Sequence, residues 1–215
     1  EANKHAMDSM RYKLNPHFIF NALNSVQAMV LSEAPDAAAG FISGYARLMR
    51  RIFDASVRST ITLADEVQLL RDYVGIERAR FAGALSFGVG VTDEIDPDVV
   101  RIPSMVVQPF LENAINHGLR DHPDGQVSLI IRGTPSSLYV HVLDNGVGLV
   151  RSPSASNRQS AGRAYHSMDA LRQRFLYMEE HGEHRLQVKI LNRRSGGTHV
   201  AIHILRIDHL QNPLP

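Results

Sequence analysis

Apolar residues recur with a helical period over residues 1–81 of the chain. Asparagine followed by proline at Asn15 and Pro16 is typical of a helix start, because proline lacks an N–H that would otherwise be unsatisfied there. The pattern predicts one helix over 16–32 and a second over 36–56. The residues expected on their apolar faces are Phe18, Ala22, Val26, Met29 and Val30 in the first, and Phe41, Tyr45, Leu48, Ile52 and Phe53 in the second.

A third helix is predicted to begin at Thr62 and to continue through Phe81. Thr62 is followed three residues later by Asp65, which is the spacing of a capping box. Such a pair satisfies backbone N–H groups that the first turn of a helix leaves without partners. The first part of the chain is therefore expected to be entirely helical.

The period changes from helical to alternating after Gly83, which predicts strands. The expected strands are "LSFGVGV" (85–91), "QVSLIIRG" (126–133), "LYVHVLDNG" (138–146) and a closing hairpin of "HRLQVKILN" (184–192) and "GGTHVAIHIL" (196–205). Two further helices are expected, at 103–118 and at 167–181, and a mobile loop at 150–165. The fold class is therefore α+β, with a helical part at 1–81 and an α/β part at 82–215.

Composition narrows the possible functions. The 215 residues are 44% hydrophobic, which allows a substantial buried core, and the net charge of +1 does not indicate nucleic acid as a partner. Cysteine is absent, which excludes disulfides and thiolate zinc sites. No apolar run approaches the roughly 20 residues of a membrane span. Because the chain begins at Glu1 rather than at methionine, we expect a fragment of a protein whose membrane or sensor segment lies upstream.

The first candidate for chemistry is His17, in "LNPHFIFNALNSV", with Asn21 one helical turn later. A buried, hydrogen-bonded histidine is one interpretation. The other is a solvent-facing nucleophile whose imidazole nitrogen accepts a phosphoryl group, with Asn21 orienting the ring or a water molecule. The residues alone leave both open.

The second candidate is "ENAINHG", which contains Glu112, Asn113 and Asn116. Asparagine is a poor residue for a helix interior, so two of them in one helix suggest a specific role. Amide oxygens are suitable ligands for Mg²⁺, which in turn holds phosphates. A solvated helix face explains the same residues equally well.

The third candidate is "DNGVGL", directly after a predicted strand. Asp144 could accept a hydrogen bond from an exocyclic amine, and Gly146 and Gly148 would let the backbone approach a ligand closely. A hairpin turn is an equally good explanation. The same ambiguity applies to Gly196 and Gly197 in "GGTHV".

The order of these motifs resembles one family of proteins. "NPHFIFN" is similar to the histidine motif of LytS/YehU-type sensor histidine kinases. "QPFLENAINHG", "DNGVGL" and "GGTHVAIHI" resemble the N box, the G1 box and the terminal G-T strand of that family's ATP-binding domain. The resemblance implies a helical dimerisation and phosphoacceptor region followed by a Bergerat-fold α/β sandwich, the fold that this family shares with gyrase and MutL.

The resemblance also implies roles for individual residues. His17 would be the phosphoacceptor, Asn21 would orient it, and Asn113 would be the Mg²⁺ ligand. Glu112 stands where hydrolysing relatives keep a carboxylate that activates water, and in a kinase it would help to activate the histidine. The residues implied to contact ATP are Asn116 and His117 near the phosphates, Asp144 at the adenine amine, Gly146 and Gly148 beside the base, and Thr198 supporting the adenine site.

One segment departs from the family pattern. Relatives carry a glycine box after the loop that covers the nucleotide, whereas this chain has "SAGRAYHSMDAL", in which Gly162 is the remaining candidate glycine. Backbone N–H groups at the start of the expected 167–181 helix would still suit a triphosphate.

The function implied by the resemblance is that of a protein histidine kinase in a two-component system. ATP with Mg²⁺ would phosphorylate His17, and the phosphoryl group would pass to an aspartate of a response regulator, such as one of the LytTR type. The chain would be a homodimer and a cytoplasmic fragment of a protein in the cell membrane. The departure around Gly162 leaves an alternative, a catalytically weak nucleotide-binding scaffold that signals through dimer geometry. An ATP-hydrolysing machine is disfavoured, because His17 would then have no role.

Overall fold

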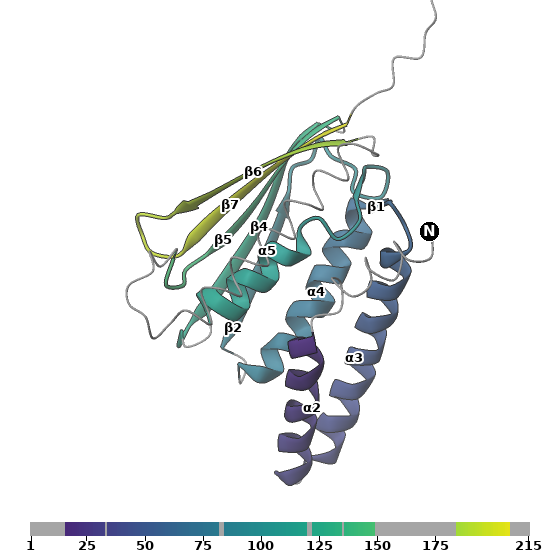
Figure 1. Cartoon of the computed structure of the whole chain (residues 1–215), viewed down its shortest axis with the longest axis vertical. Helices are drawn as coiled ribbons and strands as arrows, with labels where there is room; N and C mark the ends of the chain where they lie inside the picture. The colour runs from purple at the N-terminus through teal and green to yellow at the C-terminus, as the bar shows by residue number, and fades with distance from the viewer. Residues whose placement is uncertain are drawn as a thin grey trace, which may run out of the picture.

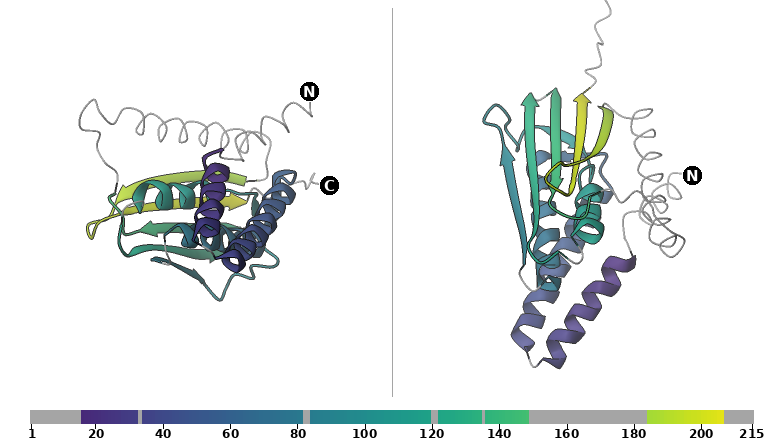
Figure 2. Two further views of the ribbon diagram at one scale, coloured as in Figure 1. Left: turned by 90° about the horizontal axis from the view of Figure 1, so that it is seen from below. Right: turned by 90° about the vertical axis from the view of Figure 1, so that its left-hand side faces the viewer.

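A computed structural model describes residues 16–32, 34–81, 84–119, 122–134, 136–148 and 184–206. Four helices and a π-helical turn lie within these ranges: α2 (Pro16–Leu31), α3 (Pro35–Ser56), α4 (Leu63–Arg80), α5 (Gln108–Asn113) and the turn Ala114–Gly118. The strands are β1 (Thr60–Thr62), β2 (Leu85–Val91), β3 (Arg101–Pro103), β4 (Gly125–Thr134), β5 (Ser137–Asp144), β6 (His184–Asn192) and β7 (Thr198–Arg206). The helices α2 and α3 extend beyond the sheet as a pair (Figures 1 and 2).

The larger of the two described sheets has five strands in the order β2-β4-β5-β7-β6. β2 pairs with β4 in parallel, and the other neighbours are antiparallel, so the sheet is mixed. Buried residues alternate with more exposed ones along β4, β5 and β7, which leaves one sheet face covered and the other in contact with solvent. The helical pair followed by this α/β sandwich confirms the predicted α+β fold class.

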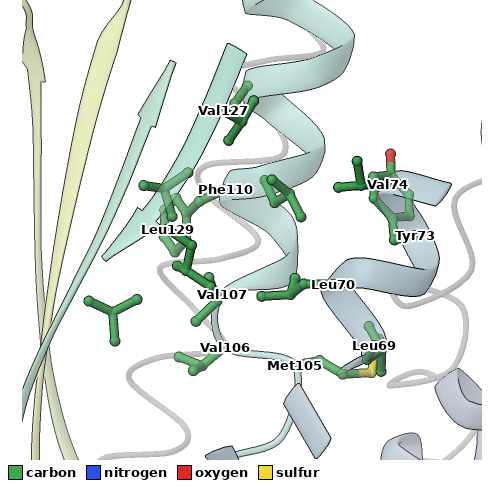
Figure 3. Close-up of a cluster of buried hydrophobic side chains, with 14 of the residues drawn as sticks. Leu69, Leu70, Tyr73, Val74, Met105, Val106, Val107, Phe110, Val127 and Leu129 are labelled. Atoms are coloured by element: carbon green, nitrogen blue, oxygen red, sulfur yellow. The ribbon is translucent and has the colours of Figure 1, made fainter. Parts of the chain in front are cut away.

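Side chains from α4, from the segment leading into α5 and from β4 form a continuous part of the core (Figure 3). Leu70 and Tyr73 of α4 are almost completely buried, as are Phe110 of α5 and Leu129 of β4. α4 therefore packs in the same hydrophobic core as the sheet, although the predicted division places it in the helical part. The division of the chain at residue 82 stays a prediction.

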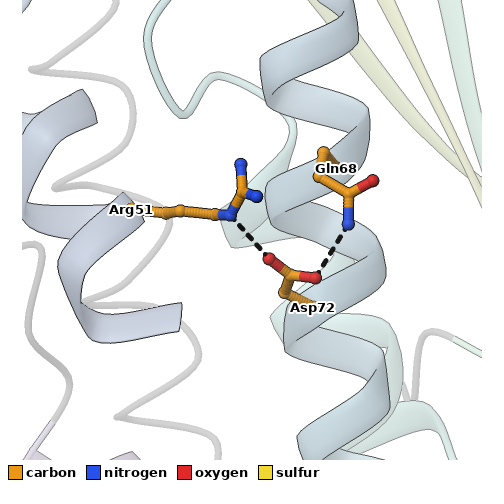
Figure 4. Close-up of polar contacts among 3 residues, drawn as sticks. All are labelled: Arg51, Gln68 and Asp72. Carbon is orange, nitrogen blue, oxygen red and sulfur yellow. Dashed lines mark hydrogen bonds and ion pairs between the residues drawn. The ribbon is translucent and has the colours of Figure 1, made fainter. Parts of the chain in front are cut away.

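An ion pair on the surface joins α3 to α4 (Figure 4). Arg51 Nε lies 2.9 Å from Asp72 Oδ2, and Gln68 Nε2 donates to Asp72 Oδ1 over 2.8 Å. The Arg51 side chain is 48% exposed, so solvent screens the pair and its contribution to stability is at most about 1 kcal/mol. The pair fixes the orientation of α3 on α4 rather than supplying much stability.

The predicted start of α4 and the predicted strands of the larger sheet agree closely with the structure. The Thr62 side chain accepts a hydrogen bond from the N–H of Asp65 over 3.1 Å, as the capping pattern predicted. The strand predictions and the closing hairpin are also confirmed. Two of the predicted apolar-face residues, Val30 and Phe53, are 59% and 56% exposed, so a single copy of the chain leaves part of these apolar faces uncovered.

The helix predicted from residue 103 is wrong at its start, since α5 begins at Gln108. Pro103 instead ends β3, which pairs with β1 in a two-stranded antiparallel sheet that the sequence did not indicate. Met105 then adopts a φ of 56°, which a helix cannot contain. The Glu66 carboxylate holds this turn by accepting the N–H groups of Met105 and Val107 over 2.8 and 2.9 Å.

Replacing Glu66 with glutamine should destabilise the fold. Glu66 is 0% exposed, and the new amide group would point a donor at one of two backbone donors. The expected loss is about 1–3 kcal/mol of unfolding free energy, the usual cost of a buried polar group without its partner. Urea denaturation measures it, with the exposed Glu94→Gln as a control expected to stay within about 0.5 kcal/mol of the parent. Equal stability of both variants would contradict the capping role.

Several expectations lie outside the described residues: the Asn15 cap, the 150–165 loop with Gly162, and the 167–181 helix. Within the described part of the chain, no helix is both long enough and apolar enough to cross a membrane.

Candidate functional site

Asp144 ends β5 and is 2% exposed. Its Oδ1 accepts hydrogen bonds from the backbone N–H of Gly146 over 2.9 Å and of Thr198 over 3.1 Å. A carboxylate that accepts backbone N–H groups is held in one orientation by the fold. The structure thus brings together Asp144, Gly146 and Thr198, three of the residues predicted to contact adenine.

Glycines around Asp144 lie against neighbouring backbone. A Cβ on Gly146 would overlap the carbonyl oxygen of Gly118, and a Cβ on Gly197 would overlap the carbonyl oxygen of Asp144. Gly197 also has a φ of 84°, which disfavours side chains independently of space. The N–H of Val147 donates to the Gly118 carbonyl over 3.1 Å. The end of the N box, the G1 box and the start of the terminal strand therefore meet at one place.

Gly148 has a φ of 75°, and a Cβ there would lie 2.9 Å from the side-chain oxygen of Asn192. This conformation suits glycine and brings the G1 segment beside the end of β6. The positive φ and the close Asn192 side chain explain why residue 148 is a glycine. That the backbone of Gly148 approaches a ligand stays a prediction.

Two residues of this region were missed by the sequence reasoning. Arg193 donates from its guanidinium to the backbone carbonyl of Asp144 over 2.5 Å, and its N–H bonds to the Gly197 carbonyl over 3.0 Å. The Asn145 side chain accepts the N–H of Gln126 over 2.8 Å and donates to the Asp124 carbonyl over 2.9 Å. An arginine at the start of the "RRSGG" turn and an asparagine inside "DNG" were the available signals.

The N-box residues lie on α5 and the π-helical turn that continues it. Asn113 is partly exposed and His117 is exposed. Asn116 donates from Nδ2 to the hydroxyl of Tyr73 over 3.2 Å. Single π-helical turns within α-helices often occur at functional sites. The structure supplies a local reason for an asparagine at 116, whereas the assignment of Asn113 to Mg²⁺ stays a prediction.

The backbone around Asp144 is closely packed. The buried Asp144 carboxylate stands beside Gly146 and Gly197, where a Cβ would overlap neighbouring backbone, so the predicted adenine contact of Asp144 stays a prediction. Within the described residues, no group of three or more histidine, aspartate or glutamate side chains is placed to hold a metal ion. A magnesium site here would therefore have to combine Asn113 with phosphate oxygens.

The carboxyl group of Glu112 has a raised pKa. Burial of its carboxyl group raises the pKa to about 7, the hydrogen bond from Gln108 Nε2 at 2.8 Å works in the opposite direction, and the buried Glu77 carboxyl raises it further. Although the residue as a whole keeps partial solvent contact, its carboxyl group is crowded by protein atoms. A carboxyl group that titrates near neutrality can both release and accept a proton in that range.

The raised pKa predicts a pH-dependent stability. The folded state binds the Glu112 proton more tightly than the unfolded chain, so the unfolding free energy should fall as pH rises from about 4.5 to about 7. Glu112→Gln removes this dependence and should change the slope over that range by up to about 1.4 kcal/mol per pH unit. Urea titrations of both proteins at pH 5 and pH 8 measure it. A Glu112→Gln variant that gains no stability relative to the parent at pH 8 would contradict the assigned pKa.

His17 is the second residue of α2, and its side chain lies outside the described part of the structure. Whether it faces solvent stays a prediction. Asn21 is partly exposed and lines a small cleft with Phe18 of α2 and Glu77 of α4, among others. The histidine motif therefore lies on α2, which packs against α4. α4 also carries Tyr73, whose hydroxyl accepts the hydrogen bond from Asn116.

The model of the histidine kinase family matches residues 5–85. The sensor histidine kinase YpdA of Escherichia coli is 32% identical over 149 residues, which cover 69% of this chain and 26% of the relative. BtsS of the same species is 31% identical over 137 residues, 62% of this chain and 23% of the relative. The sensor protein LytS of Enterococcus faecalis is 25% identical over 204 residues, 91% of this chain and 33% of the relative. The chain thus spans a third or less of the length of these relatives.

Solved structures that superpose on this chain include a histidine kinase domain from Erythrobacter litoralis. It is 16% identical, covers 93% of this chain and 94% of its own, and has a TM-score of 0.48. The catalytic domain of the histidine kinase ThkA is 13% identical, covers 68% of this chain and 94% of its own, and has a TM-score of 0.47.

The sequence comparisons agree with the four motifs and with the place where three of them meet in the fold. The family model covers the segment with "NPHFIFN", and the similarity to LytS, over 91% of this chain, includes the N box and the G1 box. The chain belongs to the family of LytS-type sensor histidine kinases.

Proposed function

We propose that this chain is the ATP-dependent autophosphorylating core of a sensor histidine kinase. The observation that carries the proposal is the Asp144 carboxylate, held by two backbone N–H groups where the N box, the G1 box and the terminal strand meet, in a chain that also has the histidine motif on α2. A nucleotide site and a phosphoacceptor are the two parts that a histidine kinase needs.

Asp144 holds the adenine in this proposal. The hydrogen bonds from Gly146 and Thr198 both end on Asp144 Oδ1, so Oδ2 is the oxygen assigned to the exocyclic amine of the base. Gly146 and Gly148 lie beside the base, and Thr198 supports the site through its backbone N–H. Arg193 keeps the end of β5 in place through the Asp144 carbonyl.

Asn113, Asn116, His117 and Gly162 serve the phosphate end of the nucleotide. Asn113 ligates Mg²⁺, which when bound neutralises charge on the phosphates during transfer. Asn116 and His117 face the phosphates from the π-helical turn, and Gly162 admits backbone N–H contacts. These residues position the γ-phosphoryl group, since positioning and charge neutralisation supply most of the catalysis in phosphoryl transfer.

His17 is the nucleophile. One neutral ring nitrogen attacks the γ-phosphorus, the bond from that phosphorus to the bridging oxygen breaks, and ADP leaves. The proton on the other ring nitrogen is then released, and Glu112 accepts it. Asn21 orients the ring. A pKa of about 7 suits Glu112 to this role near neutral pH.

Incubation with Mg²⁺ and ATP labelled at the γ-phosphate tests the proposal. We expect a label that is stable to alkali and labile to acid, and that maps to the peptide containing His17. Nucleotide binding without any label would instead favour the scaffold that signals through dimer geometry. Release of labelled inorganic phosphate without a phosphorylated protein would favour ATP hydrolysis.

The partners follow from the same proposal. The phosphoryl group passes from His17 to an aspartate of a response regulator, such as one of the LytTR type, and nucleic acid is not a partner of this chain. The full-length protein lies in the cell membrane through a segment upstream of this chain, which itself faces the cytoplasm. Transfer of label from the phosphorylated chain to a purified receiver domain tests the first of these assignments.

Homodimerisation is proposed from the surface of α2 and α3. Several large apolar side chains on this pair are exposed by 37–77%: Ile19, Phe20, Leu23, Val30, Leu31, Ile42 and Phe53. A second copy would cover these faces in a four-helix bundle. Covering each side chain fully contributes about 1.5–3 kcal/mol.

Leu23→Asp should therefore weaken the dimer. Leu23 is 60% exposed and one turn from Phe20, so a charge there would be desolvated in the bundle. Sedimentation equilibrium of the whole chain should shift from dimer to monomer at micromolar concentration. Val99→Asp, at a residue that is 71% exposed and far along the chain from the helical pair, is the control and should remain dimeric. A parent chain that is monomeric throughout would contradict the bundle.

A further inference from the structure

Three aromatic side chains from three helices meet beside the histidine motif. Phe18 of α2 directly follows His17, and its ring stacks on Tyr45 of α3 with centroids 5.5 Å apart. The same ring stacks on Tyr73 of α4 with centroids 5.2 Å apart and an interplanar angle of 29°. Tyr73 is 1% exposed. Phe18 therefore lies between two tyrosines, and any rotation or shift of α2 acts directly on Tyr73, since packed rings cannot interpenetrate.

The hydroxyl of Tyr73 reaches the N box. It accepts a hydrogen bond from Asn116 Nδ2 over 3.2 Å, across a separation of 43 residues in the chain. Phenylalanine would fill the same hydrophobic space, so the hydroxyl is not needed for packing. Desolvating a hydroxyl costs free energy, and this bond to Asn116 offsets it.

Asn116 belongs to the π-helical turn, which leads into the adenine site. The turn ends at Gly118, whose carbonyl accepts the N–H of Val147, and a Cβ on Gly118 would lie 3.1 Å from Asp144 Oδ1. A π-helical turn holds one residue more than an α-helical turn, so it can shift its register over a short segment. The Tyr73 bond anchors a side chain in the middle of that segment.

We infer that Tyr73 is a positioning residue that couples the placement of the acceptor helix α2 to the geometry of the N box. The inference rests on the proposed kinase function and adds its regulation. When α2 moves, Phe18 moves the Tyr73 ring. The hydrogen bond between the Tyr73 hydroxyl and the Asn116 side chain then lengthens or shortens. Such a coupling requires an element with two arrangements, and the inference assigns this part to the π-helical turn.

Tyr45 provides a matched comparison within the same cluster. Its ring also stacks on Phe18, and its buried hydroxyl has no hydrogen-bond partner in the described structure. Burial alone raises the pKa of Tyr45. Tyr45→Phe and Tyr73→Phe therefore remove the same atom from neighbouring rings, but only Tyr73→Phe removes a link to the N box.

The experiment compares these two variants with the parent chain in three measurements. The autophosphorylation rate at saturating Mg²⁺-ATP should fall about five- to tenfold in Tyr73→Phe, the effect of losing one buried hydrogen bond. The dissociation constant for a non-hydrolysable ATP analogue should change less than the rate, because Asp144 is untouched. Hydrogen exchange of the amides at 114–118, without nucleotide, should speed up. Tyr45→Phe should match the parent in all three.

A rate and an exchange profile that both match the parent in Tyr73→Phe would overturn the inference. So would equal losses in Tyr45→Phe, since general loosening of the cluster would then explain them. If Tyr73→Phe does not fold, Phe18→Leu takes its place, because it removes the ring contact and leaves the hydroxyl. Faster exchange at 114–118 in Phe18→Leu supports the coupling, and unchanged exchange refutes it. Should the parent chain not autophosphorylate, the proposed function fails, while the exchange measurement still decides the coupling.

Discussion

His17→Gln is expected to abolish ATP-dependent labelling of the chain while leaving nucleotide affinity nearly unchanged. Glutamine has a similar length and helix propensity, so α2 should persist. It lacks a ring nitrogen that can attack phosphorus, so no phosphoramidate can form. The nucleotide site is built from other segments, around Asp144 and Thr198, and should remain intact.

Labelling and binding are measured in parallel to separate these effects. Filter retention of protein-bound label reports phosphorylation, and calorimetric titration with a non-hydrolysable ATP analogue reports affinity. His122→Gln is the control, because His122 lies outside the motifs and its ring accepts only the local N–H of Asp124. Survival of the label in His17→Gln would show that another residue is the acceptor. Loss of label in both variants would point to a general effect of losing a histidine.

Asp144→Asn should weaken ATP binding about 5- to 150-fold. Two backbone N–H groups bond to Oδ1, so an asparagine would place its amide oxygen there and its NH₂ group at the position of Oδ2. The NH₂ group would then face the exocyclic amine of adenine, donor against donor. A buried polar group left without its partner costs about 1–3 kcal/mol, which corresponds to that range of affinity.

Specificity for the base provides a sharper test of Asp144. GTP carries a carbonyl where ATP carries the exocyclic amine, so the NH₂ group of Asp144→Asn should disfavour GTP less than ATP. We therefore expect the ratio of ATP to GTP affinity to fall in Asp144→Asn. Asp93 is exposed, and Asp93→Asn removes the same charge, so it serves as the control. It should retain the affinity for ATP and the affinity for GTP. Unchanged ATP affinity in Asp144→Asn would remove Asp144 from the site.

Local rules account for the helices and strands that were predicted correctly. The helical period places Phe41, Leu48 and Ile52 on one buried face of α3, and the Thr62 cap depends on a residue only three positions away. Alternation likewise predicted β4, β5 and the closing hairpin. These features depend on residues close in sequence, so they can be read from short windows.

The prediction failed where distant segments compete with local preference. The stretch before Gln108 has a helical pattern, but pairing of β3 with β1 and the Glu66 carboxylate hold it in another conformation. Glu66 and Met105 are separated by 39 residues, so no local pattern could show the contact.

By itself, the sequence determined the order of the main helices and of the strands of the larger sheet, the resemblance to a family and the motifs that name the candidate residues, because each of these depends on short runs of neighbouring residues. Only the tertiary structure decided which motifs meet: Gly118, Asp144 and Thr198 at one place, Arg193 on the Asp144 carbonyl, and Asn116 on Tyr73. The physical reason is that these are hydrogen bonds and close backbone approaches between segments far apart in the chain. Their partners are selected by packing of the whole core, since a buried donor or acceptor must find whatever partner the fold brings to it.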